Sequence, residues 1–361
     1  MSENQYRSVL LNRAAAIEAS GADAGVAAHY GAPTREARKL FQGQAIADLS
    51  HLDVLELRGE DRQSWLNTLS SQSITGLKPG QSSQALLLSV QGRIEHEMKV
   101  LIDTDRVLLI VEKDCAEPLQ KFLESMRFML RVELTNLSST HGVLGAVREI
   151  PTCNDLVWRN PWPEISTGGW AYSRADHPGL ERPWFLHVVE LERLAEAVGE
   201  EELAGTMAVE SLRIAAWEPR FGFENDDKTI PHELDWLRTA VHMDKGCYKG
   251  QETVARVHNI GHPPRRLVFL HLDGSMHTLP APGSEIKLGE RTIGKLTSAS
   301  LHYEAGPIAL GVIKRNVDPE AVLSVVDGES VYPASQEVIV ATDAGQTAGR
   351  FTGFLRTPPT A

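Results

Sequence analysis

The sequence predicts an α+β fold that ends in a small β-barrel, and the patterns of three successive stretches carry this prediction. Residues 52–134 alternate between strand-like and helix-like patterns, in the order strand, helix, three strands, helix, strand. Residues 140–260 show a second mixture of strands and helices. After residue 263 the pattern changes to short apolar strands separated by turns that contain glycine.

The first stretch of the chain, residues 1–45, is rich in small and polar side chains and shows little sustained periodicity, so we expect short helices and loops there. Residues 52–57 then alternate as a half-buried strand does. The next segment places Trp65, Leu66 and Leu69 on one face of a helix. A strand followed by a helix therefore opens the first α+β unit.

Three strands and a second helix continue this unit. Residues 85–90 form an apolar run that suits a buried strand, and 94–102 and 107–111 follow after turn residues. A helix is expected from Ala116, because Pro118 lies in its first turn and apolar residues recur at spacings of three and four. One side of that helix must pack on the sheet.

The middle of the chain is predicted to contain a strand at 143–147, an irregular segment at 151–183, a strand at 184–189 and helices around 191–198 and 212–216. Tryptophans stand in and beside the irregular segment. They either line an aromatic ligand pocket or fill the junction between domains. These residues are Trp158, Trp162, Trp170 and Trp184.

Evenly spaced short strands with glycine-containing turns predict the barrel. The expected strands are residues 267–272, 285–288, 294–298, 308–313 and 337–340. We therefore expect five parts along the chain. They are an N-terminal segment at 1–45 that packs on the middle domain, α+β domains at 46–136 and 137–262, the barrel at 263–345 and a flexible tail at 346–361.

The composition limits the classes of function. A formal net charge of −12 argues against broad binding to nucleic acid or to an anionic membrane. No apolar run reaches the roughly 18 residues that a membrane span needs, and the N-terminus lacks a signal-peptide pattern, so we expect a cytoplasmic protein. Three widely spaced cysteines without a C-x-x-C pair suit reduced thiols and predict no metal centre.

One stretch has the character of a site: residues 245–252, with the sequence Lys-Gly-Cys-Tyr-Lys-Gly-Gln-Glu. Glycines near Cys247 on both sides let a ligand or a partner approach closely, and Lys245 and Lys249 favour the thiolate over the thiol. The alternative is a glycine-rich turn whose cysteine is only a small buried residue.

This stretch resembles the K-G-C-Y-x-G-Q-E signature of the YgfZ family of folate-binding proteins. Those proteins are relatives of the glycine-cleavage T-protein, an aminomethyltransferase, and are implicated in maintaining iron–sulfur enzymes. Further segments resemble the T-protein family, so that the resemblance extends over residues 46–340. The segments are 48–50, 59–62, 77–80 and 294–298.

The resemblance implies a ring of two α+β domains and a barrel around a central opening the size of a folate. The implied cofactor is tetrahydrofolate or a related reduced folate. The implied partners are iron–sulfur client or assembly proteins, with a link to tRNA modification. Cys247 is the residue through which the protein is expected to act. The residues expected to bind the folate are Lys245, Gly246, Tyr248, Gly250, Gln251, Arg238 and His96.

His96 and Arg238 are assigned on chemical grounds. In a strand, Glu95 and Glu97 share one face and His96 lies on the other, so a shift of one residue decides which side chain reaches the pocket. His96 is either a general base or a strand histidine without a function. Arg238 either pairs with the glutamate tail of a folate or forms a surface salt bridge.

Two departures from the T-protein pattern bear on the reaction. The adjacent acids that follow its hairpin are replaced here by Glu95, His96 and Glu97. The glutamate of its L-R-x-E-A-G segment, which hydrogen-bonds the pterin, corresponds to Ala215, and an alanine side chain cannot accept those bonds. Both departures favour a folate-binding accessory protein. A tetrahydrofolate-dependent aminomethyl- or methyltransferase is the alternative.

Overall fold

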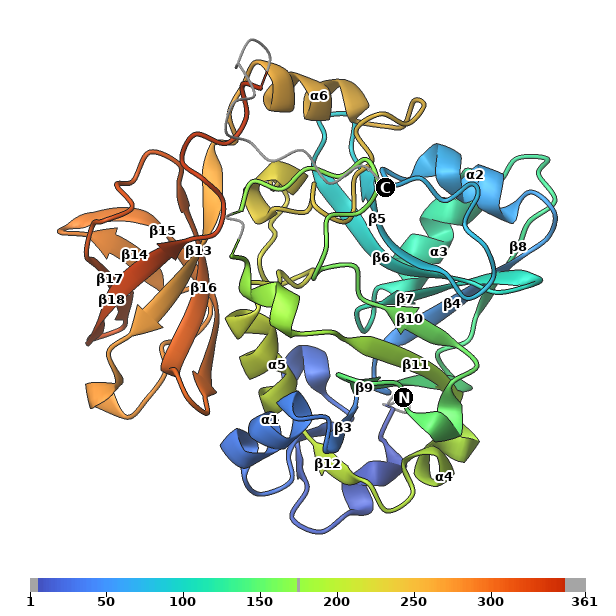
Figure 1. Cartoon of the computed structure of the whole chain (residues 1–361), viewed down its shortest axis with the longest axis horizontal. Coiled ribbons are helices and arrows are strands. Elements are labelled where there is room, and N and C mark those ends of the chain that lie inside the picture. The colour runs from blue at the N-terminus through green and yellow to red at the C-terminus, as the bar shows by residue number, and fades with distance from the viewer. Residues whose placement is uncertain (1–5, 174–175, 348–361) are drawn as a thin grey trace, which may run out of the picture.

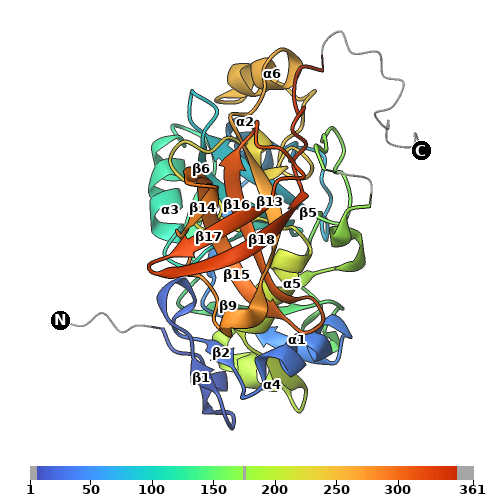
Figure 2. The same ribbon diagram turned by 90° about the vertical axis from the view of Figure 1, so that its left-hand side faces the viewer.

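The computed structural model describes residues 6–173 and 176–347. These residues form two five-stranded sheets, a closed barrel of six strands and a two-stranded sheet near the N-terminus. The barrel lies beside the two larger sheets rather than between them (Figures 1 and 2). The predicted α+β class with a C-terminal barrel is confirmed.

The first large sheet is antiparallel and has the strand order β5-β6-β7-β4-β8. Its strands are β4 (Asp53–Arg58), β5 (Ser82–Leu88), β6 (Ile94–Ile102), β7 (Arg106–Val111) and β8 (Glu133–Asn136). Helices α2 (Arg62–Leu69) and α3 (Ala116–Ser125) cover one face, where their apolar sides join the alternate apolar residues of the strands. Each predicted strand and helix of this unit is present.

The second large sheet has the order β10-β11-β9-β3-β12, and β12 pairs with β3 in parallel. Its strands are β3 (Ala45–Asp48), β9 (His141–Ala146), β10 (Val157–Arg159), β11 (Phe185–Glu190) and β12 (Glu202–Ala204). Helices of this unit are α1 (Pro33–Phe41), α4 (Leu194–Val198) and α5 (Thr206–Ala215). The chain before it forms β1 (Ile17–Glu18) and β2 (Ala27–His29).

The N-terminal segment is tied to the middle of the chain, because the carboxylate of Glu36 in α1 accepts a hydrogen bond from the Gly205 backbone at the start of α5. Strand β3 belongs to the second sheet although it precedes the whole of the first. We therefore propose a division of the chain by sheets, in which the first α+β unit begins at β4 rather than at residue 46.

The two large sheets pack face to face. Leu108 and Ile110 of β7 share one buried apolar cluster with Leu186 and Val188 of β11 and with Trp158 of β10. Sheets that pack in this way bury one face each, and here the helices cover the opposite face of the first sheet. A polar cavity interrupts the layer between them.

The barrel has the order β13-β16-β15-β14-β17-β18. Its strands are β13 (Arg265–Leu272), β14 (Glu285–Leu288), β15 (Arg291–His302), β16 (Gly306–Lys314), β17 (Leu323–Asp327) and β18 (Ser330–Val338). Strand β17 was not predicted, and the strand expected at 337–340 begins earlier, at Ser330. The outer side of the barrel packs on α5 and on a cluster of aromatic residues that includes Trp217 and Trp236.

Residues 245–250 form the loop that contains Cys247, here called the Cys247 loop. Helix α6 (Gln251–Asn259) follows this loop directly and precedes the barrel. The predicted flexible tail falls mostly on residues 348–361, which lie outside the described residues. Among the helices that the structure does describe, each is too short or too polar to cross a membrane.

Candidate functional site

A cavity of about 80 Å³ lies between the two large sheets. Its wall combines strands of both sheets, helix α5, the loop before Phe221 and one residue of the N-terminal segment. The charged and strongly polar residues of the wall are Asp23, His51, Gln84, Glu97, Lys99, Glu112, Arg182, Glu210, Arg213, Glu218 and Arg220. A space of this size holds roughly five to eight water molecules. It is smaller than the folate-sized opening that the resemblance implied.

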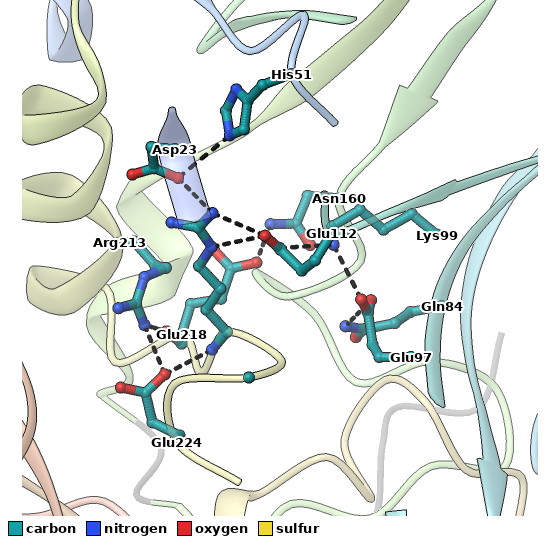
Figure 3. Close-up of polar contacts among 12 residues, drawn as sticks. Asp23, His51, Gln84, Glu97, Lys99, Glu112, Asn160, Arg213, Glu218 and Glu224 are labelled. Carbon is teal, nitrogen blue, oxygen red and sulfur yellow. Dashed lines mark hydrogen bonds and ion pairs between the residues drawn. The ribbon is translucent and has the colours of Figure 1, made fainter. Parts of the chain in front are cut away.

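Strand β6 presents Glu97 and Lys99 to the cavity, since alternate residues of a strand point the same way. The Lys99 ammonium lies 3.0 Å from Glu97 and 3.9 Å from Glu112, and Gln84 donates to Glu97 at 2.9 Å (Figure 3). Burial alone would lower the pKa of Lys99, but the two carboxylates outweigh it and raise that pKa. Lys99 is therefore held as a cation.

Arg220 joins the two sides of the cavity. Its Nη2 donates to Glu112 and to Asp23, each at 2.7 Å, and its Nη1 donates to Glu210 at 3.2 Å. Burial opposes ionisation of both Asp23 and Glu112, yet the pKa of each carboxyl is lowered. The hydrogen bond from His51 and the charge of Arg220 lower it at Asp23, and the charges of Arg220 and Lys99 lower it at Glu112. Both of these carboxyls, Asp23 and Glu112, are thus ionised at neutral pH.

Arg213 of α5 connects the cavity to the barrel. It donates to Glu210 and to Glu224, and its Nη2 reaches Ser298 of β15 at 2.8 Å. Ala215, two residues further along α5, packs against the apolar cluster that contains Trp217 and Trp236. The position that holds a glutamate in the T-protein pattern is therefore part of an apolar contact here.

The tryptophans divide between two places. Trp158 and Trp184 line the cavity and also belong to the core between the two sheets, and their contact with a ligand stays a prediction. Trp162 and Trp170 lie in or against the apolar cluster that contains Trp217 and Trp236, where they fill the junction with the barrel.

The Cys247 loop lies at the turn between β5 and β6. Its cysteine is exposed, whereas Tyr248 is buried in the apolar cluster beside the barrel. Gly250 has a φ of +86°, and a Cβ there would come within 2.5 Å of the Ser89 carbonyl oxygen. Gln251 at the start of α6 donates to the Lys245 carbonyl at 3.0 Å. The loop is therefore fixed at its base and presents the sulfur outward.

Replacing Gly250 by alanine should lower the free energy of unfolding by roughly 1–3 kcal/mol, because an L-residue is strained at this φ. Thermal or urea unfolding measures the change. The matched control is Gly246→Ala, since a Cβ at Gly246 meets no atom within 4 Å. That variant should stay within about 0.5 kcal/mol of the parent. Equal losses in the two variants would contradict the role given to Gly250.

The two lysines of the loop have partners away from the thiol. The ammonium of Lys245 donates to the carbonyl oxygens of Asn67, Ser70 and Gln72 at 2.6–2.8 Å, at the C-terminal end of α2. Burial lowers the pKa of Lys245 to about 8, so it is still mostly protonated at neutral pH. Lys249 pairs with Glu95 at 3.0 Å. The expectation that both charges favour the Cys247 thiolate is therefore not supported by these contacts.

His96 and Arg238 do not line the cavity. The pairing of β5 with β6 shifts by one residue at Glu95, which places Glu97 toward the cavity and turns His96 to the other face, against Phe122 of α3. Burial lowers the pKa of His96. His96 therefore faces away from this cavity, and its assignment to a ligand pocket stays a prediction without support from this position.

Arg238 is buried rather than at the surface. Its Nε lies 3.2 Å from Asp235, and its Nη2 donates to Ser173 at 2.6 Å. Its guanidinium is also 5.7 Å from the ring of Trp162. The surface salt bridge that was one alternative for Arg238 is thus replaced by this internal pair, and pairing with the tail of a folate stays a prediction.

A continuous series of hydrogen bonds runs from the Cys247 loop to the cavity. Lys245 donates to the Gln72 carbonyl, and the Gln72 side chain donates to the Thr239 carbonyl at 2.8 Å. The Thr239 hydroxyl donates to Gln84 at 2.6 Å, and Gln84 donates to Glu97. The loop and the cavity are separate in space but share this buried connection.

Sequence reasoning missed most of the cavity wall. A lysine in the apolar run of β6 and a glutamate at the end of β7 are signals that charges face a polar space. Asp23 and Arg182 lie at the ends of short 3-10 helices and Arg220 lies in a loop, and these positions carry no such signal.

Comparison with known proteins agrees with this architecture. Residues 11–147 match the family described as the GCVT N-terminal domain. The chain is 33% identical over 302 residues to the tRNA-modifying protein YgfZ of an Escherichia coli O127:H6 strain, covering 75% of this chain and 86% of that protein. It is 25% identical over 305 residues to the aminomethyltransferase of a Nostoc species, covering 78% and 79%.

A putative chloroplastic transferase of Arabidopsis thaliana is 24% identical over 297 residues, covering 76% of this chain and 66% of that protein. The fold matches the crystal structure of the glycine cleavage system aminomethyltransferase T of Bartonella henselae, with a TM-score of 0.71 and 17% sequence identity over 94% of this chain and 97% of that one. Taken with the likeness to the Escherichia coli protein and the K-G-C-Y-x-G-Q-E stretch, these findings show that the chain belongs to the YgfZ family of folate-binding proteins related to the T-protein.

Proposed function

We propose that this chain is a folate-binding accessory protein that acts through Cys247 to support the assembly or repair of iron–sulfur enzymes, among them enzymes that modify tRNA. Membership of the YgfZ family supports the folate, and the name of the Escherichia coli relative, a tRNA-modifying protein, supports the link to tRNA. The exposed thiol in the signature stretch supports the role of Cys247.

The observation that carries the folate proposal is the cavity between the sheets. Its size suits one two-ring heterocycle, so the pteridine ring would enter it while the benzoyl-glutamate tail stays outside. Carboxylates of the wall would accept from the N–H groups of that ring. Because these carboxylates already pair with Lys99, Arg213 and Arg220, a ligand has to share them, and weak binding is expected.

The test is calorimetric titration with 5-formyltetrahydrofolate, for which we expect micromolar affinity. Without a carboxylate at Ala215, one charge-assisted hydrogen bond of about 1.5–3 kcal/mol is lost, which weakens binding roughly ten- to a hundredfold. Glu97→Gln should weaken binding further. Glu95→Gln, on the same strand but outside the cavity wall, is the matched control and should leave binding unchanged. Nanomolar affinity, or no binding at millimolar ligand, would contradict the proposal.

A tetrahydrofolate-dependent transferase is the second candidate, and the position of Glu97 favours it. This carboxylate reaches the cavity from the strand that follows the hairpin, where a general base would stand. Its two oxygens, however, already accept from Gln84 and Lys99, so a substrate proton would have to displace one of these hydrogen bonds. A turnover assay with tetrahydrofolate and methylated or aminomethylated amines separates the two functions, and we expect no turnover.

A further inference from the structure

Arg182 differs from the other cations of the cavity wall in how few of its N–H groups have partners. Arg213 and Arg220 each donate to several carboxylate oxygens, and Lys99 has two carboxylates nearby. Arg182 is 5% exposed, and its Nη1 donates to Glu218 at 2.5 Å. Its buried Nε has no hydrogen-bond partner among the described residues.

The guanidinium of Arg182 is nonetheless held in a fixed place. It lies 4.6 Å from the ring of Trp184, which also lines the cavity, and stacking of this kind orients a guanidinium plane. Glu218 is fixed in turn by Asn160, which donates to its other oxygen at 2.7 Å. Burial lowers the pKa of Arg182, and the charge of Glu218 offsets only part of that lowering. The charge of the guanidinium is therefore only partly compensated. A buried charge with an unused donor is a place for an acceptor from a ligand.

We propose that Arg182 recognises the carbonyl oxygen of the pteridine ring in the cavity. The inference rests on the proposed folate binding and names the residue that selects the ring. The cavity wall offers carboxylates, which accept from the amino and N–H groups of a pterin, and Arg182 of the same wall would donate to the carbonyl on the same edge of the ring. A ring that carries an amino group in place of the carbonyl oxygen would direct N–H groups at a guanidinium.

The experiment compares tetrahydrofolate with its 4-amino counterpart, tetrahydroaminopterin, by calorimetry on the full chain. The parent should bind tetrahydrofolate about 10- to 100-fold more tightly, as expected for one charge-assisted hydrogen bond. In Arg182→Met this preference should fall to within about threefold. Arg182→Lys keeps the charge but not the fork of donors and should retain part of the preference.

Arg266→Met is the matched control. Arg266 is a fully buried arginine of the barrel whose Nη1 also has no partner among the described residues, and it is not in the cavity wall. That variant should keep the full preference of the parent even if it loses stability. This separates ligand recognition from the general cost of removing a buried arginine.

The possible failures are distinguishable. If the parent binds both compounds equally, or if Arg182→Met keeps the preference, the role of Arg182 is wrong and folate binding stands. If the parent binds neither compound, the proposed function fails and this inference fails with it. Should Arg182→Met not fold, a full preference in a folded Arg182→Lys variant, equal to that of the parent, would overturn the inference, and a reduced one would support it.

Discussion

Replacing Cys247 by alanine should abolish the restoration of iron–sulfur enzyme activity in cells that lack the protein, while the variant folds and binds folate as the parent does. The side chain is exposed and makes no hydrogen bond with the described residues, so its removal should change the free energy of unfolding by less than about 1 kcal/mol. Complementation measures the loss of function. Thermal unfolding and calorimetry verify that the fold and the affinity are kept.

Cys115 and Cys153 are internal controls for this result. Both are partly buried, and burial raises the pKa of each thiol to about 11, so few of these groups are thiolates at neutral pH. Iodoacetamide should therefore modify Cys247 first, and the alanine variants of the other two cysteines should complement fully. Faster modification of Cys115 or Cys153, or full complementation by Cys247→Ala, would show that the exposed thiol is not the functional group.

The largest loss of stability is expected from Arg220→Met, at about 3–5 kcal/mol. The guanidinium is 11% exposed and donates to Asp23, Glu112 and Glu210, so its removal leaves buried carboxylates without a counter-charge. Urea unfolding at pH 7 measures the loss. Arg58→Met is the control, because Arg58 also contacts two carboxylates, Glu56 and Asp105, but at the surface, and it should change stability little.

The loss of stability in Arg220→Met should depend on pH. Asp23 and Glu112 have lowered pKa values in the folded protein, so the stability that they contribute is present above their unfolded pKa of about 4 and is lost as the pH falls through the folded values. The difference between parent and Arg220→Met should therefore be greatest at neutral pH and shrink below about pH 4. A difference that grows toward acid pH would mean that Arg220 does not act through these carboxylates.

Local patterns were sufficient for most elements of the fold. The alternation of Leu55 and Leu57, and the apolar stripe of Leu119 and Leu123, are visible in the sequence because each repeats within one strand or helix. The exposure of Cys247 was likewise indicated by its neighbouring glycines. These features depend on residues close together in the chain.

The cavity was not predictable, because the residues of its wall come from distant parts of the chain. Arg220 meets Glu112 and Asp23, which precede it by 108 and 197 residues. The side of β6 that carries His96 was set by a single extra residue in the strand, and the sequence contains no separate signal for that bulge. Such contacts exist only once the sheets have packed.

The hydrogen-bonded series from Lys245 through Gln72, Thr239 and Gln84 to Glu97 has a thermodynamic consequence. A ligand that donates a hydrogen bond to Glu97 would compete with Gln84 for that carboxylate and so act on the end of the series. If occupancy of the cavity changes the equilibrium constant for oxidation of the Cys247 thiol, then reciprocity requires that oxidation of the thiol changes the dissociation constant of the ligand by the same factor. The affinity of the cavity for its ligand would then depend on the redox state of the Cys247 thiol, although Cys247 is not part of the cavity wall.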